Sequence, residues 1–162
     1  MVKSITLIII STVIGVWASN FTIGSFYQYS LKKDVFDPST VSKRDDKYVA
    51  LGLSLGGDIP IEGRGLKYIG INSDIGFDVG ATTGAYPYLS IGNDWLFSPK
   101  DNWLVGPSLG FGVSGVHFGI RVNYKGVFIK TLYGFWQDKN ITEFADKQQS
   151  IKVTIGYSFG KK

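Results

Sequence analysis

The stretch just before the C-terminal end of the chain alternates between two kinds of side chain at every position. One side of an extended backbone would carry the apolar residues Ile151, Val153, Ile155, Tyr157 and Phe159. The other side would carry Lys152, Thr154, Gly156 and Ser158. A period of two is the pattern of a β-strand whose faces meet different surroundings. The stretch therefore predicts a strand over 151–159.

The same period recurs along most of the chain. Seven further segments carry it, over residues 21–31, 47–56, 66–80, 86–97, 102–113, 116–124 and 127–137. Polar or glycine-containing connections separate them, and the 21 glycines suit a chain of many strands and turns. Eight consecutive strands close most simply into an antiparallel up-and-down barrel, because closure leaves no unpaired sheet edge. The sequence predicts an all-β, eight-stranded barrel with a bulge at Pro107, where a strand donor is missing.

The first residues have the pattern of a secretory signal peptide. Lys3 precedes an apolar run from Ile5 to Trp17, and Ala18 ends a sequence that resembles a cleavage site. The run is shorter than the roughly 20 residues that a membrane-spanning helix needs. We expect a signal peptide over 1–18 and a barrel domain over 19–162.

Two kinds of barrel fit the alternation, and the less apolar face distinguishes them. A soluble secreted barrel would point its apolar face inward and expose long polar side chains to water. Here the other face is mostly Gly, Ser, Asn and Ala, which suit the crowded interior of a narrow barrel. The apolar face fits lipid, with an aromatic belt expected near the strand ends at Tyr29, Trp95, Phe97, Trp103 and Tyr124. A membrane barrel is favoured, with a soluble periplasmic lipid-binding barrel as an alternative.

The residues around Gly156, Tyr157 and Phe159 resemble the C-terminal signal of bacterial outer-membrane proteins. In those proteins the barrel-assembly machinery reads alternating aromatics that end in Phe, whereas this chain continues with Gly160, Lys161 and Lys162. The chain resembles the OmpA/OmpX-like eight-stranded barrels in size and strand number. That resemblance implies an outer-membrane location and contact with outer-membrane lipids and lipopolysaccharide.

An even strand number places both termini at one end, which the resemblance makes periplasmic. The longest connections, 32–46 and 138–147, would then face outward, where loops commonly bind ligands. The segment 57–65 reads as a turn that is long for the periplasmic side. We expect any extracellular ligand to bind through 32–46 and 138–147.

The inward face collects ionisable residues that form an expected polar network. Its members are Asp74, Asp78, Asp94, His117, Arg121, Lys130 and Lys152. Position along the strands groups Asp94 with Arg121 and Lys130, and Asp78 with His117 and Lys152. Burying an unpaired ion is costly, so these charges are expected to pair. A plug that holds the barrel together is favoured over a gated ion path or a ligand site.

Catalytic and metal chemistry have little support in the sequence. The chain has no Cys and one His, which leaves no thiolate site and little room for a metal centre or cofactor. His117 with Ser114 and Asp78 permits an acyl hydrolase or transferase, but Gly119 departs from the motif of lipid A deacylases. Scattered charges and a net charge of +4 give no nucleic-acid footprint.

Together these features predict an outer-membrane barrel without enzyme activity that has a structural or surface-interaction role, such as adhesion or reception. A lipid A-modifying barrel enzyme or a narrow pore is the alternative.

Overall fold

The computed structural model describes residues 20–37, 42–45, 48–61, 65–80, 84–112, 115–138 and 146–160. The segment expected to be a signal peptide, 1–18, lies outside these residues. Within the described part every regular element is a β-strand. No helix there is long and apolar enough to cross a membrane.

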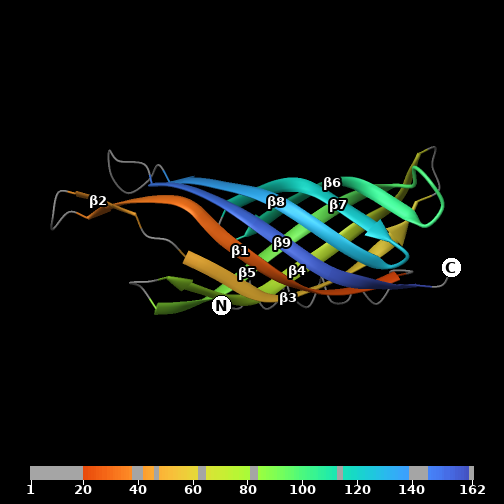
Figure 1. The fold of residues 1–162 in the computed structure, drawn as a ribbon, viewed down its shortest axis with the longest axis horizontal. Helices are drawn as coiled ribbons and strands as arrows, with labels where there is room; N and C mark the ends of the chain where they lie inside the picture. The colour runs from red at the N-terminus through yellow and green to blue at the C-terminus, as the bar shows by residue number, and fades with distance from the viewer. Residues whose placement is uncertain are drawn as a thin grey trace.

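The strands form one antiparallel sheet that closes on itself (Figure 1). They are β1 (Asn20–Asp37), β2 (Ser42–Asp45), β3 (Tyr48–Pro60), β4 (Leu66–Gly80), β5 (Gly84–Phe97), β6 (Trp103–Gly112), β7 (Gly115–Tyr124), β8 (Val127–Asp138) and β9 (Asp146–Gly160). Consecutive strands from β3 to β9 pair with one another, and β1 pairs with both β3 and β9. The predicted eight-stranded barrel is confirmed, with the short β2 as an addition outside its wall.

The two ends of the barrel differ. The turn end holds Ile61 and Gly65, which flank the connection from β3 to β4, the turns 98–102 and 125–126, and Asn20 and Gly160, which pair with each other. At the opposite, extended end, β1 and β9 continue past the wall and β2 pairs with the tip of β1. Figure 1 shows the extended end on the left and the turn end on the right.

The strands are staggered around the barrel. Starting at Thr22, one can step from each residue to its partner on the next strand, from β3 round to β9. The last step returns to β1 at Ser30, not at Thr22. Such a stagger means that the strands tilt from the barrel axis, which lets eight strands enclose an interior of side-chain width.

Both long connections expected to be polar loops are partly strand, so those expectations were wrong in their bounds. β1 runs on to Asp37 and pairs with β2 inside 32–46, and β9 begins at Asp146 inside 138–147. Residues 38–41, 46–47 and 139–145 lie outside the described part. Residues 32–37 do not alternate between apolar and polar side chains, so the period that predicted the other strands does not extend over them.

The turn expected over 57–65 was also placed too early. β3 continues to Pro60, and Ile61 N–H donates to the Lys67 carbonyl at 2.9 Å. Pro60 is the last residue of its strand, where a missing donor is tolerated. Asp58 therefore belongs to the strand, and its side chain points inward and is fully buried.

Pro107 interrupts the pairing of β5 with β6 without a bulge. The pairs Asp94–Ser108 and Phe97–Val105 keep one register, and only the pairs between them are missing. Pro107 itself stays paired with Ile120 of β7. The expected bulge is therefore absent. The missing N–H of Pro107 instead leaves a short gap in the hydrogen bonding between β5 and β6.

Rings and glycines share the interior. Phe26, Gly52, Gly76 and Tyr88 are consecutive partners across β1, β3, β4 and β5. The two rings lie with centroids 5.0 Å apart, although two strands separate their backbones. A Cβ added at Gly52 or Gly76 would lie 2.2 or 2.1 Å from a backbone carbonyl oxygen of the other strand, so both positions require glycine.

Candidate functional site in the barrel interior

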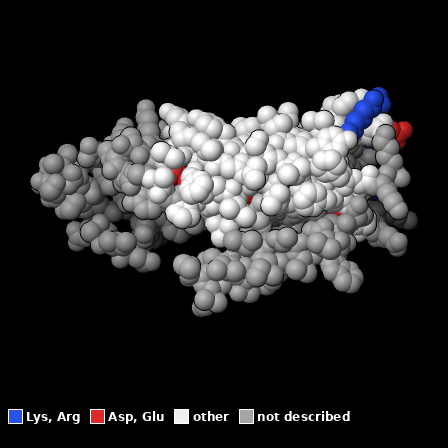
Figure 2. Space-filling view, turned by 90° about the horizontal axis from the view of Figure 1, so that it is seen from below, with Lys and Arg blue, Asp and Glu red and all other residues white. Residues whose placement is uncertain are grey.

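The barrel has an inverted distribution of polarity. Large apolar side chains such as Leu53 and Ile120 are more than half exposed on the outside, whereas charged side chains are buried within. Among the side chains that the structure describes, the inward charged residues are Asp58, Asp74, Asp78, Asp94, Arg121, Lys130 and Lys152, and the others are Lys67, Lys100, Asp101 and Lys125 at the turn end. Figure 2 shows one side of the barrel, where the described surface is nearly free of charge except at the turn end.

The first group of inward charges, here called the Arg121 cluster, lies toward the turn end. Arg121 of β7 makes two parallel contacts with Asp58 of β3, Nη1 to Oδ1 at 2.8 Å and Nη2 to Oδ2 at 2.9 Å. Its Nη1 also donates to Asp94 Oδ2 of β5 at 3.0 Å. The guanidinium lies 4.5 Å from the ring centroid of Phe128. The planar fork of Arg suits this two-pronged geometry, which Lys could not reproduce.

Lys130 and Asn72 complete the Arg121 cluster. Lys130 Nζ donates to Asn72 Oδ1 at 2.8 Å and lies 3.7 Å from Asp94 Oδ1. The amide nitrogen of Asn72 donates to Asp94 Oδ2 at 3.1 Å. The expected grouping of Asp94, Arg121 and Lys130 is therefore found in the structure, with Asp58 and Asn72 added to it.

The second group, the Lys152 cluster, lies farther toward the extended end. Lys152 of β9 forms an ion pair with Asp74 of β4 and donates to Ser90 Oγ at 2.9 Å. Tyr88 donates its hydroxyl hydrogen to Gln28 Oε1 at 2.7 Å, and Lys152 Nζ is 3.4 Å from the same hydroxyl. Lys152 therefore pairs with Asp74, not with Asp78 as expected from position along the strands.

The two clusters follow one rule of chain order. Every carboxylate in their ion pairs comes from β3, β4 or β5, and every base comes from β7, β8 or β9. The pairs therefore cross the lumen instead of linking adjacent strands. They tie the two halves of the chain together through the interior, and the low dielectric there makes each pairing strong and each unpaired charge costly.

His117 occupies the lumen near the extended end and is fully buried. It lies between Gly110 of β6 and Gly134 of β8, its paired residues. A Cβ added at Gly134 would lie 2.3 Å from His117 Cδ2, so the imidazole ring fills the space that a side chain would take. Ser114, its expected companion in a hydrolase site, lies outside the described residues. The observed contacts are those of a packed interior residue.

Sequence reasoning missed several members of the interior network, among them Asn72, Ser90, Asp58, Gln28 and Tyr88. Asp58 was assigned to a turn, although Ala50, Gly52, Ser54 and Gly56 extend the inward alternation to it. Gln28 and Tyr88 were placed on the inward face but were not expected to take part, because neither carries a charge. Continuing the alternation through Gly57 would have identified Asp58.

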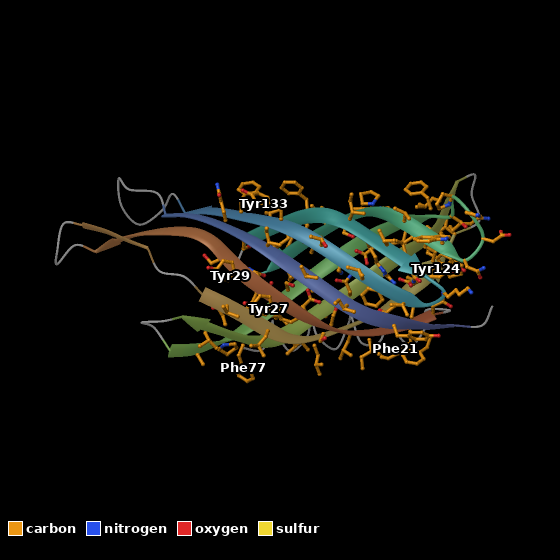
Figure 3. The ribbon with its side chains drawn as sticks, in the orientation of Figure 1. Phe21, Tyr27, Tyr29, Phe77, Tyr124 and Tyr133 are labelled. Carbon is orange, nitrogen blue, oxygen red and sulfur yellow. The ribbon has the colours of Figure 1, made fainter. Side chains whose placement is uncertain are left out.

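Aromatic side chains collect outside the wall near both ends of the barrel. Figure 3 shows Tyr27, Tyr29, Phe77 and Tyr133 toward the extended end, and Phe21 and Tyr124 toward the turn end. Exposed fractions are 37% for Tyr29, 42% for Phe97, 38% for Trp103 and 43% for Tyr124, and Trp95 is half-buried.

Two ring pairs reinforce the group at the turn end. The centroids of Trp103 and Tyr124 are 4.6 Å apart, and those of Tyr157 and Phe159 are 4.8 Å apart. Gly156, the third residue of the expected assembly signal, points inward, where a Cβ would lie 2.5 Å from Phe128 Cζ. The signal residues therefore divide between the outer wall and the lumen.

The described residues contain no group of three or more His, Asp or Glu side chains placed to hold a metal ion. Comparison with known proteins finds no matching family model, no matching curated protein and no matching solved structure.

Proposed function

We propose that this protein is a bacterial outer-membrane barrel whose apolar wall faces lipid and whose interior is closed by ionic and aromatic contacts. The observation that carries the proposal is the inverted polarity of the barrel. Lys130 and Lys152 are almost fully buried inside, while Leu53 and Phe77 are more than half exposed outside. Water would favour the opposite arrangement, and hydrocarbon favours this one.

The dimensions of the wall support the same proposal. Phe21 and Tyr29 of β1 belong to the aromatic groups at opposite ends of the barrel. The two residues are eight steps apart along the strand, which is roughly 26 Å along β1 and about 20 Å along the barrel axis after tilting. Lipid-facing walls of outer-membrane barrels have an apolar band of about 25 Å between aromatic girdles.

The role that fits this barrel best is structural or surface-interacting rather than enzymatic. Ion pairs and rings cross the lumen at two levels, which supports a closed interior. The strands of the extended end project beyond the wall and would carry any contacts with outside partners. A planar-bilayer recording tests the closed interior, and steady conductance would favour the narrow-pore alternative.

Membrane fractionation tests the location. The protein should be found with outer membranes, require detergent for extraction and migrate differently on gels before and after heating. A protein that stays soluble without detergent would contradict the proposal.

Substitution of the wall separates a lipid-facing surface from a water-facing one. Leu53→Lys puts a charge on a residue that is 54% exposed in the middle of β3. In lipid this should cost about 2–4 kcal/mol of folding free energy. In water the same change should be neutral or improve solubility. Ser98→Lys, in the exposed turn 98–102, is the matched control and should change little.

A further inference from the structure

The turn end of the barrel opens into a hollow of about 390 Å³. Its polar lining comes from elements all around the mouth, namely Asn20 of β1, Lys67 of β4, Asn102 and Lys125 of two turns, Asn123 of β7 and Ser158 of β9. The volume is at the small end of the range for ligand sites, which suits a ligand no larger than a single sugar ring.

The lining combines two kinds of recognition group. Asn side chains both donate and accept hydrogen bonds, and with Ser they match the hydroxyl groups of a sugar. Lys67 and Lys125 stand at the rim of the hollow and are exposed to solvent, and the Lys125 ammonium lies 5.4 Å from the ring centroid of Tyr124. Ammonium groups bind a carboxylate through charge-assisted hydrogen bonds.

Backbone strain at the rim is a second, independent observation. Lys125 has φ of 49° and Asn102 has φ of 67°, the only two described residues other than glycine with positive φ. Lys125 N–H donates to the Asn102 carbonyl at 3.1 Å, so a backbone hydrogen bond links the two positions with positive φ. The hairpin position of Lys125 favours Asn, Asp or Gly, and a lysine there costs stability. Strain of this kind collects at functional sites.

The walls of the hollow are ordered by contacts beneath them. Asn123 Oδ1 accepts a hydrogen bond from Gly126 N–H at 3.2 Å, and Ser158 N–H donates to the Gly126 carbonyl at 2.7 Å. Ser158 Oγ also contacts Asp58 Oδ2 at 3.1 Å, which joins the hollow to the Arg121 cluster. Binding groups held in place in this way lose less entropy when a ligand arrives.

We propose that the hollow at the turn end binds an acidic monosaccharide unit, with Lys125 and Lys67 on its carboxylate and the surrounding amides on its hydroxyls. The site goes beyond the proposed membrane role and is independent of it, since the mouth opens to solvent in either setting.

The experiment titrates the purified full-length protein in detergent with glucuronic acid and with glucose, each read by saturation-transfer NMR, and with inorganic phosphate, read by how far it displaces the glucuronic acid signal. Glucuronic acid should bind in the millimolar range, while glucose and phosphate should bind at least about tenfold more weakly, because each lacks one of the two recognised features. Equal binding of glucose, equal binding of phosphate, or no binding of glucuronic acid would each overturn the proposal.

Lys125→Asn removes the ammonium group and supplies a residue that prefers positive φ. It should weaken glucuronic acid binding about tenfold while the thermal midpoint stays equal or rises. Lys100→Asn is the matched control, since Lys100 is exposed in the neighbouring turn and does not line the hollow. Unchanged binding by Lys125→Asn, or equal weakening by Lys100→Asn, would contradict the site.

Discussion

Arg121 and Asp58 lie on strands of opposite halves of the chain and meet through two parallel contacts of 2.8 and 2.9 Å in the barrel interior. Their side chains are 2% and 0% exposed. A buried pair of this geometry adds little over an apolar pair of the same shape, but removing one partner leaves an isolated charge. Substitutions that remove one partner or both therefore have different expected outcomes.

Arg121→Met should lower the free energy of unfolding by about 3–5 kcal/mol, because Asp58 and Asp94 lose their shared partner. Asp58→Asn in the same chain should restore part of the loss by removing one uncompensated charge. Urea unfolding of the protein refolded in lipid vesicles measures both. Lys100→Met, an exposed turn residue, is the control, and an Arg121→Met variant as stable as that control would contradict the prediction.

The ion pair of Lys152 with Asp74 should show strong coupling in a double-mutant cycle. Lys152→Met alone and Asp74→Asn alone should each be destabilising by more than 1 kcal/mol, and the double variant should be less destabilised than their sum. The reason is that each single change strands the other group in the lumen. Additive effects in vesicle unfolding would mean that the pair contributes no mutual stabilisation.

Two glycines beside His117 should respond differently to the same substitution. Gly134→Ala places a methyl group 2.3 Å from the imidazole and should destabilise by about 1–3 kcal/mol. Gly110→Ala meets its nearest neighbour at an ordinary 3.5 Å and should be neutral or slightly stabilising.

Removing the imidazole tests the origin of that difference. His117→Ala combined with Gly134→Ala should recover part of the stability lost in Gly134→Ala alone, because the clash with the imidazole disappears and only the one with Ser150 Oγ, at 2.6 Å, remains. If Gly110→Ala proves the more harmful of the two glycine changes, the packing of His117 differs from that described.

Trp103 should report the depth of the aromatic group at the turn end. Its ring is 38% exposed on the outer wall beside Tyr124. In a variant that keeps Trp103 and carries Phe at the other three tryptophans, lipids brominated near the headgroup should quench fluorescence more than lipids brominated near the chain end. Stronger quenching by the deep label would contradict a girdle at the interface.

Sequence periodicity predicted the wall of this barrel well because each wall strand has two unlike faces. The strand Leu66–Gly80 was predicted with its observed bounds. Period two did not predict the strand where the residues do not alternate, as over 32–37 of β1, or where turn-forming residues close a strand, as at Pro60. The ends of these strands depend on hydrogen bonding to a neighbouring strand, and the alternation of side chains carries no information about that pairing.

The interior was predictable in its composition but not in its pairings. The inward positions of Asp74 and Lys152 follow from period two alone, whereas their contact depends on the stagger of strands far apart in the chain. The same is true of Phe26 and Tyr88, whose rings meet across Gly52 and Gly76. The residue pattern within one strand does not show how that strand is staggered relative to distant strands. The sequence therefore placed these side chains on the inward face but could not say which of them meet across the lumen.

The pairing of β1 with β9, from Asn20 and Gly160 onward, bears on how the protein is made. The first strand to leave the ribosome must wait for the last strand before either has both neighbours. Until then the chain has two unsatisfied edges, and the bases of β7 to β9 have not reached the carboxylates of β3 to β5. The sheet therefore keeps two open edges until β9 is in place, and an open sheet edge is prone to aggregation.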